Sequence, residues 1–480
     1  MLCFGLVVLC GLGLRLWGIT DHPLALDEPF SVYHAQFSLR HIVDTLLEGN
    51  NPPLYELFLH GWIRLFGTDV LWVRLPSVLF SALAGGFWFL AVVRSVPLYI
   101  SLGVAALFAF STQYIYFSHE ARSYGLLLLG LAVAAFFWTR LLWGEKRGNG
   151  FVLLAAFFTA ITVYVHYLAL IPVGLALIFG YFIATREKRG LWLRFVCGAS
   201  LLMLPIVIFL LMRMMEPKTG GLWGVAPQWT QLYGFANIFL NGKWTLACLS
   251  GIVLLTVGLY LKSKKKPAIG NEGWAALLFL GLVFGCGYLA MYVVSYRAPI
   301  FIERYVQVMM PFFFVLLGVA FFWLLGKFKV GKWLWAVLLL VFCLQVNVSL
   351  GNERRPQVAA EMSRTFLQES PARAVLITPF WYNLTFAYYF DRAAFASPEL
   401  GAPLAAQNTY AVWNGTETAD WLDAHAAGTE SILLLDAGES FVTGKQDVLD
   451  VLRTQYALTK TDSVDKAVRA YYFTRKKSAE

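Results

Sequence analysis

The chain has 480 residues, of which 59% are hydrophobic, 16% aromatic and only 14% charged, and its formal net charge is +9. A typical soluble domain carries about 25% charged residues, so this composition excludes both an ordinary soluble globular protein and an intrinsically disordered one. The class that fits is a polytopic α-helical membrane protein.

Eleven apolar stretches are long enough to be transmembrane helices, because a spanning helix needs about 20 apolar residues. Their ranges are 1–19, 71–93, 97–117, 121–143, 151–165, 168–185, 191–212, 245–261, 273–295, 306–326 and 333–350. The fifth and sixth come from one continuous apolar run that is too long for a single helix. We place the break between them at His166-Tyr167.

The first outer loop, residues 20–70, is predicted to contain helices that lie in the membrane interface. In the stretch from Leu54 to Phe66, apolar residues recur every three to four positions, and Tyr55 and Trp62 are among them. This periodicity is typical of an amphipathic helix, and aromatic residues favour the membrane–water interface.

The basic residues predict the orientation of the spans. Residues 1–350 contain 25 Lys and Arg residues, and 15 of them fall on the inner side if the N-terminus is cytoplasmic. This asymmetry is what the positive-inside rule requires. Eleven spans then place the C-terminus outside the cytoplasm. The sequence therefore predicts a multi-pass protein of the cell (inner) membrane with a cytoplasmic N-terminus.

The last part of the chain differs from the rest. Residues 351–480 have a net charge of −3, against +12 for residues 1–350, and they contain no apolar run long enough to span a bilayer. Short strand patterns alternate there with helical patterns. The strands are expected at 374–378, 431–435 and 468–473, and the helices near 356–369, 380–390 and 445–457. We therefore predict a transmembrane domain over 1–350 and a small extracytoplasmic α/β domain over 351–480.

Ionisable residues gather at the predicted outer ends of the spans. An ionisable group at membrane depth is costly, so each is a candidate functional residue. They are Asp27, Glu28, Glu120, Arg122, His166, Arg297, Glu303 and Arg304. The centres of the spans are nearly free of polar groups, whereas a transporter places such groups near the midplane. The pattern therefore favours surface chemistry on a lipid-soluble substrate. The positive net charge reflects topology, and no nucleic-acid partner is expected.

Structural explanations stay open for the same residues. The acidic pair after the first span can begin a solvated loop or cap a helix. His166 can be a turn histidine whose hydrogen bonds lie within the protein. Glu120 and Arg122 can form an interfacial ion pair, and the two arginines beside the ninth and tenth spans can be snorkelling anchors.

Three groups of motifs together resemble the bacterial relatives of protein O-mannosyltransferases, which are GT-C membrane glycosyltransferases of family 39. The first group is Leu26-Asp27-Glu28-Pro29-Phe30-Ser31, Asn51-Pro52-Pro53-Leu54-Tyr55 and Arg74-Leu75-Pro76-Ser77. The second is His119-Glu120-Ala121-Arg122-Ser123-Tyr124. The third is Tyr164-Val165-His166-Tyr167 with Glu303-Arg304-Tyr305 and Pro311. The resemblance covers about residues 1–320 in order and spacing. Many relatives carry His where this chain has Asn51.

This resemblance implies a GT-C fold and sugar transfer from a polyprenyl-phosphate donor. An acceptor hydroxyl would attack the anomeric carbon just outside the membrane, and the lipid phosphate would leave. The resemblance gives Asp27 the role of general base. It gives Glu28 or Glu120 the role of orienting the acceptor or holding a metal ion.

The leaving phosphate needs cations, for which the planar guanidinium of Arg is well suited. By the same resemblance, the donor-phosphate-binding residues are Arg122, Arg297, Arg304 and Tyr305. A divalent metal ion held by His166 and Glu120 is the one cofactor that the resemblance suggests. No glycine-rich nucleotide-binding loop is visible, which is consistent with a lipid-linked donor.

The predicted function is therefore a membrane glycosyltransferase, transferring a hexosyl or pentosyl group. It would move the sugar from a polyprenyl-phosphate donor to a hydroxyl of a cell-surface glycan, lipid or protein. Its expected partners are the donor, the acceptor and membrane lipids. Two other functions stay open: a transporter or flippase of a lipid-linked saccharide, and a non-catalytic membrane scaffold with an exported binding domain.

Overall fold

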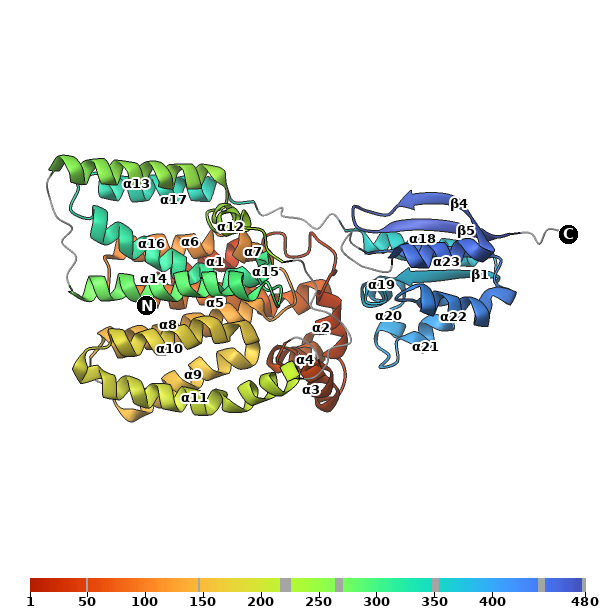
Figure 1. Ribbon diagram of the computed structural model, residues 1–480, viewed down its shortest axis with the longest axis horizontal. Helices are drawn as coiled ribbons and strands as arrows, with labels where there is room; N and C mark the ends of the chain where they lie inside the picture. Colours follow the sequence, from red (N-terminus) through yellow and green to blue (C-terminus); the bar gives the residue numbers. More distant parts are fainter. Residues whose placement is uncertain are drawn as a thin grey trace. The chain divides into compact units, whose positions relative to one another are not determined.

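The computed structural model describes residues 1–48, 51–145, 147–215, 226–263, 271–347, 354–438 and 445–476. The chain divides into two compact units (Figure 1). The membrane unit comprises residues 1–19, 43–58 and 74–350. The tail unit comprises residues 20–42, 59–73 and 351–480. Two stretches of the predicted outer loop thus belong to the tail unit.

The membrane unit is helical. Its helices are α1 (Leu2–Leu16), α6 (Leu98–Ala109), α7 (Thr112–Ser118), α8 (Tyr124–Trp143), α9 (Asn149–Val165), η1 (Tyr167–Ala169), α10 (Leu170–Ile183), α11 (Arg186–Met215), α12 (Gln231–Phe239), α13 (Lys243–Ser263), α14 (Asn271–Val294), α15 (Glu303–Val306), η2 (Gln307–Met309), α16 (Met310–Leu325) and α17 (Gly331–Leu344). Three more helices, α3 (Leu39–Glu48), α4 (Leu54–Phe66) and α5 (Val70–Val92), have residues in both units.

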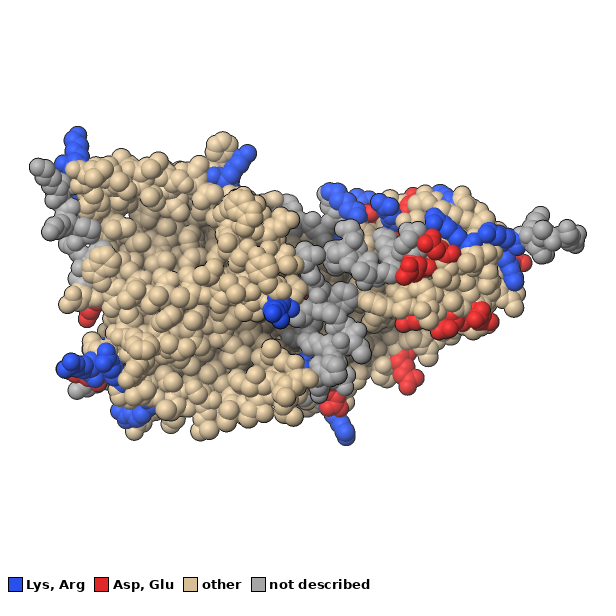
Figure 2. Space-filling view, viewed as in Figure 1, with Lys and Arg blue, Asp and Glu red and all other residues tan. Residues whose placement is uncertain are grey.

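The multi-pass helical fold is confirmed. Among the described residues, six helices are long and apolar enough to cross a membrane, or seven if the bent pair α6–α7 is one span. Four shorter apolar helices accompany them. Each predicted span coincides with one of these helices or with the bent pair, while the count of eleven spans stays a prediction. Figure 2 shows a wide surface without charged side chains over the membrane unit, with Lys and Arg side chains at its margins.

The predicted break at His166 is confirmed. Helix α9 ends at Val165, and His166 has an extended backbone with φ −159° and ψ 131°. Its Nδ1 atom accepts a hydrogen bond from the backbone N–H of Leu168 at 3.2 Å. The side chain therefore satisfies a backbone donor at the start of the next helical segment, where helix termini lack intrahelical partners.

The third predicted span is bent by 51° between α6 and α7. Opening a helix at membrane depth leaves backbone groups without partners, and each costs several kcal/mol unless another group bonds to it. Arg15, which is only 2% exposed, supplies part of this need. Its guanidinium donates to the carbonyl oxygens of Phe108 at 2.9 Å and Ala109 at 3.2 Å, and also to Ser81 Oγ at 2.8 Å.

Asn241 supplies further hydrogen-bond partners for the backbone at this bend. Its Nδ2 donates to the carbonyl oxygen of Phe110 at 2.7 Å, and its Oδ1 accepts from the N–H of Thr112 at 2.9 Å. Asn241 itself has φ +58°, a left-handed conformation that Asn tolerates better than most residues. Two distant side chains, Arg15 and Asn241, thus hold the bend open, and helix α7 beyond the bend leads into the turn at residues 119–123.

The tail unit contains a five-stranded mixed sheet with strand order β2-β1-β3-β5-β4. The strands are β1 (Arg373–Thr378), β2 (Thr409–Ala411), β3 (Ser431–Asp436), β4 (Tyr456–Ser463) and β5 (Arg469–Arg475). Strand β1 is parallel to β2 and β3, and β5 is antiparallel to β3 and β4. The helices are α2 (Glu28–His34), α18 (Pro356–Gln368), α19 (Tyr382–Phe390), α20 (Arg392–Phe395), α21 (Gly401–Ala405), α22 (Gly415–His425), η3 (Ala426–Gly428) and α23 (Lys445–Gln455).

The small C-terminal sheet domain is confirmed, but the sequence did not predict β2 and β4. Strand β2 has three residues, and β4 is an edge strand whose residues are mostly exposed. Neither has the apolar alternation from which a strand is usually recognised.

Tyrosines of α19 hold the loop segments in the tail unit. The Tyr389 hydroxyl accepts from the N–H of Leu24 at 2.5 Å, and the Tyr388 hydroxyl donates to the carbonyl oxygen of Thr68 at 2.9 Å. Arg392 pairs with Asp69 at 3.2 Å. These contacts join both ends of the loop to the C-terminal domain, and no local sequence pattern could have shown them.

Candidate functional site

Five side chains meet at the N-terminal end of α8 and form what we call the polar cluster: Arg122, Tyr124, His166, Arg304 and Tyr305. The His166 ring stacks on Tyr124 with centroids 6.0 Å apart, and it meets Tyr305 edge-on at 5.9 Å. The Arg304 guanidinium lies 5.4 Å from the Tyr305 ring centroid. Arg122 and His166 are both buried. Three motifs that are distant in sequence thus meet at one place in the fold.

The cluster concentrates positive charge around a neutral histidine. Burial, together with the charges of the nearby Arg122 and Arg304 guanidinium groups, lowers the pKa of His166 to about 3. His166 is therefore uncharged at physiological pH, while both arginines keep their charge. Two cations that face the same buried ring form a local field suited to an anion such as a phosphate.

Glu56 is a member of this region that the sequence analysis missed. Its carboxylate lies 4.0 Å from the Arg122 guanidinium, and both side chains are buried. A signal for it exists in the sequence. Glu56 lies between Tyr55 and Leu59, which are both fully buried on α4, so it is an acid on the apolar face of an amphipathic helix.

A chain of hydrogen bonds connects the loop motifs to the turn at 119–123. The Tyr55 hydroxyl lies 3.3 Å from Ser77 Oγ, which donates to the carbonyl oxygen of Arg122 at 3.2 Å. Helix α8 approaches this point closely at Gly125, where an added Cβ would lie only 2.6 Å from the Ser77 carbonyl oxygen. A glycine is therefore required there, and the conformation of the Arg122 backbone is fixed from two sides.

Two other candidates are placed differently. Glu120 is half-buried in the same turn, where its carbonyl accepts from the N–H of Arg122 at 2.8 Å, and its charge acts on Tyr124. Arg297 is exposed and makes none of the contacts of the polar cluster. The geometry thus supports Arg122 and Arg304 as a pair of cations that could bind a phosphate, but it does not support Arg297 in that role.

Asp27 and Glu28 lie in the tail unit at the start of α2. The Asp27 carboxylate is exposed and does not cap this helix, so the helix-cap interpretation does not apply. Glu28 is buried, and its Oε2 accepts from the N–H of Ala25 at 3.5 Å. Leu26, directly before the acidic pair, has φ +58°. A branched residue in this conformation is strained, and such strain is concentrated at functional sites.

The residues at the polar cluster do not fit a metal site. Among the described residues, no group of three or more His, Cys, Asp and Glu side chains is arranged to hold an ion. His166 uses Nδ1 to accept from Leu168, and two arginines add repulsion for any cation beside it. The arrangement of His166 and Glu120 therefore does not favour a metal ion between them.

Neither a protein-family model nor a curated protein sequence matches the chain. Solved structures do. ArnT from Cupriavidus metallidurans, solved in the apo state and bound to undecaprenyl phosphate, is 12% identical, with a TM-score of 0.56 over 97% of each chain. The oligosaccharyltransferase AglB from Archaeoglobus fulgidus, solved with an inhibitory peptide and a dolichol-phosphate, is 10% identical, with a TM-score of 0.52 over 98% of this chain and 73% of its own. The chain has the fold of these two proteins, and the predicted GT-C fold is confirmed.

Proposed function

We propose that the protein is a membrane glycosyltransferase that moves a sugar from a polyprenyl-phosphate donor to an acceptor hydroxyl. The observation that carries this proposal is the polar cluster, in which Arg122 and Arg304 flank a buried, neutral His166 at the end of the spans. A lipid phosphate at the membrane surface needs such a cationic, partly desolvated site. The fold supports the same class of ligand, because ArnT binds undecaprenyl phosphate and AglB binds a dolichol-phosphate.

The reaction needs a base and a stabilised leaving group. The acceptor oxygen forms a bond to the anomeric carbon, and the bond between that carbon and the phosphate oxygen breaks. The electron pair of the broken bond stays on the phosphate, where Arg122 and Arg304 stabilise the developing charge. The hydroxyl proton passes to the carboxylate of Asp27, which the family resemblance makes the general base.

Three further acidic residues are proposed to support the reaction. Glu56 fixes the Arg122 side chain through their ion pair, and Glu28 or Glu120 orients the acceptor. The transferred group is a hexosyl or pentosyl unit, and the acceptor is a glycan, lipid or protein of the cell surface. We also propose that the protein lies in the cell (inner) membrane and that its C-terminal domain is extracytoplasmic, an orientation that the charge asymmetry of the sequence supports.

The test is binding of undecaprenyl phosphate to the purified protein in lipid nanodiscs. A charge-assisted hydrogen bond to phosphate is worth about 1.5–3 kcal/mol, so Arg304→Ala should weaken binding by about 10- to 100-fold. Arg64→Ala removes an exposed arginine of α4 and should leave binding unchanged. If the wild type and Arg304→Ala bind undecaprenyl phosphate with equal affinity, Arg304 does not bind the donor phosphate.

A flippase of lipid-linked saccharides is the second candidate function. It would bind the same lipid, so binding alone does not separate the two. Asp27→Asn separates them, because lipid movement needs no general base. Loss of sugar transfer in this variant supports the transferase, and preserved lipid scrambling without any transfer in the wild type supports the flippase.

A further inference from the structure

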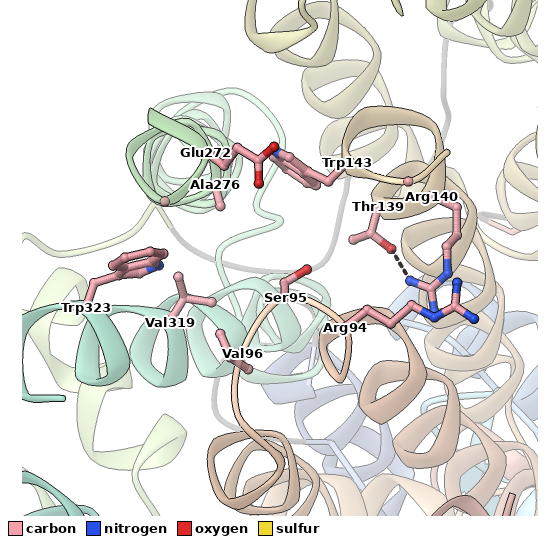
Figure 3. Close-up of a pocket in the computed structure, with 12 residues that line it drawn as sticks. Arg94, Ser95, Val96, Thr139, Arg140, Trp143, Glu272, Ala276, Val319 and Trp323 are labelled. Atoms are coloured by element: carbon pink, nitrogen blue, oxygen red, sulfur yellow. Dashed lines mark hydrogen bonds between the residues drawn. The ribbon is translucent and has the colours of Figure 1, made fainter. Parts of the chain in front are cut away.

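A cavity of about 180 Å³ opens among four helices of the membrane unit (Figure 3). It lies where α5, α8 and α16 end and α14 begins. Its polar and aromatic lining includes Arg94, Ser95, Thr139, Arg140, Trp143 and Trp323. Figure 3 shows the Arg94 and Arg140 side chains together at one side of this cavity, with the Trp323 indole at the other. We call it the basic cavity.

The basic cavity and the polar cluster lie at opposite ends of α8. The polar cluster includes Tyr124, the first residue of this helix, and the cavity is lined by Trp143, the last. A helix of 20 residues is about 30 Å long, which equals the thickness of the hydrocarbon core of a bilayer. The cavity therefore faces the leaflet opposite to the one that the polar cluster serves.

Arg140 of the basic cavity is fixed in place but not neutralised. Arg140 is only 7% exposed, and its guanidinium donates to the carbonyl oxygen of Leu90 at 2.9 Å and lies over the Phe136 ring at 4.7 Å. In the described part of the chain, no carboxylate lies within ion-pair distance of Arg140 or Arg94. The charges of Arg94 and Arg147 instead repel that of Arg140.

Carboxylates are present near the cavity but do not balance this charge. Glu272 lines the cavity at the start of α14, and Glu145 follows α8 in an exposed position. Among the residues that the structure describes, three arginines outnumber these two acids, so the site keeps an excess of positive charge. A half-enclosed arginine beside two others is unfavourable unless an anion joins them.

We propose that the basic cavity binds the phosphate of an anionic phospholipid headgroup. The cavity lies at headgroup level, where Trp143 and Trp323 provide the amphipathic surface typical of the membrane interface. The hydroxyl of Ser95, which also lines the cavity, adds a neutral donor beside the guanidinium groups. Basic pockets between transmembrane helices are suited to such headgroups. A phosphatidylglycerol headgroup also carries hydroxyl donors that can bond to the Glu272 carboxylate. This proposal does not depend on the proposed function.

The experiment measures the lipids that the purified full-length protein retains. The protein is reconstituted in phosphatidylcholine nanodiscs with an equal amount of phosphatidylglycerol, and released lipids are counted by native mass spectrometry. The wild type should retain phosphatidylglycerol in preference to phosphatidylcholine. The double variant Arg94→Gln/Arg140→Gln should lose this preference by about tenfold or more, because two charge-assisted contacts are removed.

The matched control is Arg189→Gln/Arg194→Gln, which removes two arginines near the start of α11 outside the cavity. It should keep the preference, and an equal loss in this control would overturn the proposal. Arg94 is exposed, so the single variant Arg94→Gln tests the site even if the double variant fails to fold. Unchanged retention in folded Arg94→Gln and folded Arg140→Gln would also overturn it.

Two further arms identify the source of the phosphate. Inorganic phosphate or glycerol phosphate at millimolar concentration should not displace phosphatidylglycerol, because neither has acyl chains to hold it in the bilayer. Displacement by either would assign the site to a soluble phosphate. Phosphatidylethanolamine should be retained less than phosphatidylglycerol, because its ammonium adds to the positive charge of the site, and equal retention would overturn the anionic preference.

Discussion

The two ends of α8 both bury an arginine, but in opposite electrostatic surroundings. Arg122 has the Glu56 carboxylate at 4.0 Å and a neutral His166 beside it, whereas Arg140 has two other arginines as its charged neighbours. The backbone differs as well. The Arg122 end has a bent span and a broken helix pair that buried side chains hold open, while the Arg140 end consists of plain helix termini. Basic charge alone therefore does not distinguish the proposed site from the opposite end of α8, whereas irregular backbone with buried polar partners does.

The largest expected effect concerns sugar transfer, and it tests whether the acidic and cationic residues at the predicted outer ends of the spans carry out this reaction. Asp27→Asn keeps the shape of the side chain but removes its basicity, so turnover should fall by about 10²- to 10⁴-fold while donor binding is retained. The measurement is steady-state transfer from a polyprenyl-phosphate sugar. Asp21→Asn, an exposed acid in the same loop, should transfer at the normal rate. Near-normal turnover of Asp27→Asn with an inactive Glu120→Gln would make Glu120 the base.

The second prediction concerns the ion pair between Glu56 and Arg122, because Arg140 has no such partner among the described residues. Glu56→Gln leaves the buried Arg122 without its carboxylate, and breaking a buried ion pair costs about 3–5 kcal/mol. We expect a lower unfolding midpoint, followed by fluorescence during titration with denaturing detergent. The variant Glu56→Gln/Arg122→Gln should recover part of the loss, because no uncompensated charge is left. No recovery in the double variant would show that the two side chains are not coupled.

The third prediction concerns the bend that leads to the turn at 119–123. Asn241→Ala removes the three hydrogen bonds of the side chain, to Phe110, Thr112 and Phe342, and also places Ala at φ +58°. Each buried group left unsatisfied costs about 1–3 kcal/mol. Asn241→Gly loses the same hydrogen bonds but tolerates the backbone conformation, so it should lose less stability than Asn241→Ala. Equal stability of Asn241→Gly and the wild type would show that the side chain does not hold the bend.

Features that depend on neighbouring residues could be predicted from the sequence, whereas features that depend on contacts between distant residues could not. The spans and the break at His166 follow from local hydropathy and run length, and they were predicted. The sequence predicted that Arg122, His166 and Arg304 lie at one face of the membrane, but it did not predict their contacts within one cluster. The roles of Arg15 and Asn241 could not be predicted, because each bonds to backbone atoms about 90 to 130 positions away in the chain. The same holds for the loop segments that tyrosines of α19 hold in the tail unit.

The smallest expected effect sharpens the contrast between a neutral histidine at one end and permanent cations at the other. The folded protein keeps His166 neutral down to a pKa of about 3, whereas the unfolded chain protonates it near 6.5. Acidification therefore adds a proton to the unfolded state first, so the stability associated with His166 is present above pH 6.5 and is lost as the pH falls toward 3. The expected loss of stability between pH 6.5 and pH 5 is about 2 kcal/mol, since one pKa unit corresponds to about 1.4 kcal/mol.

His166→Gln should flatten this part of the curve of unfolding midpoint against pH, while Arg140→Gln should not, because an arginine does not titrate in this range. A slope that is the same in His166→Gln and the wild type would mean that His166 has the same pKa in the folded and the unfolded protein, and the polar cluster would then gain a third cation below about pH 6.5.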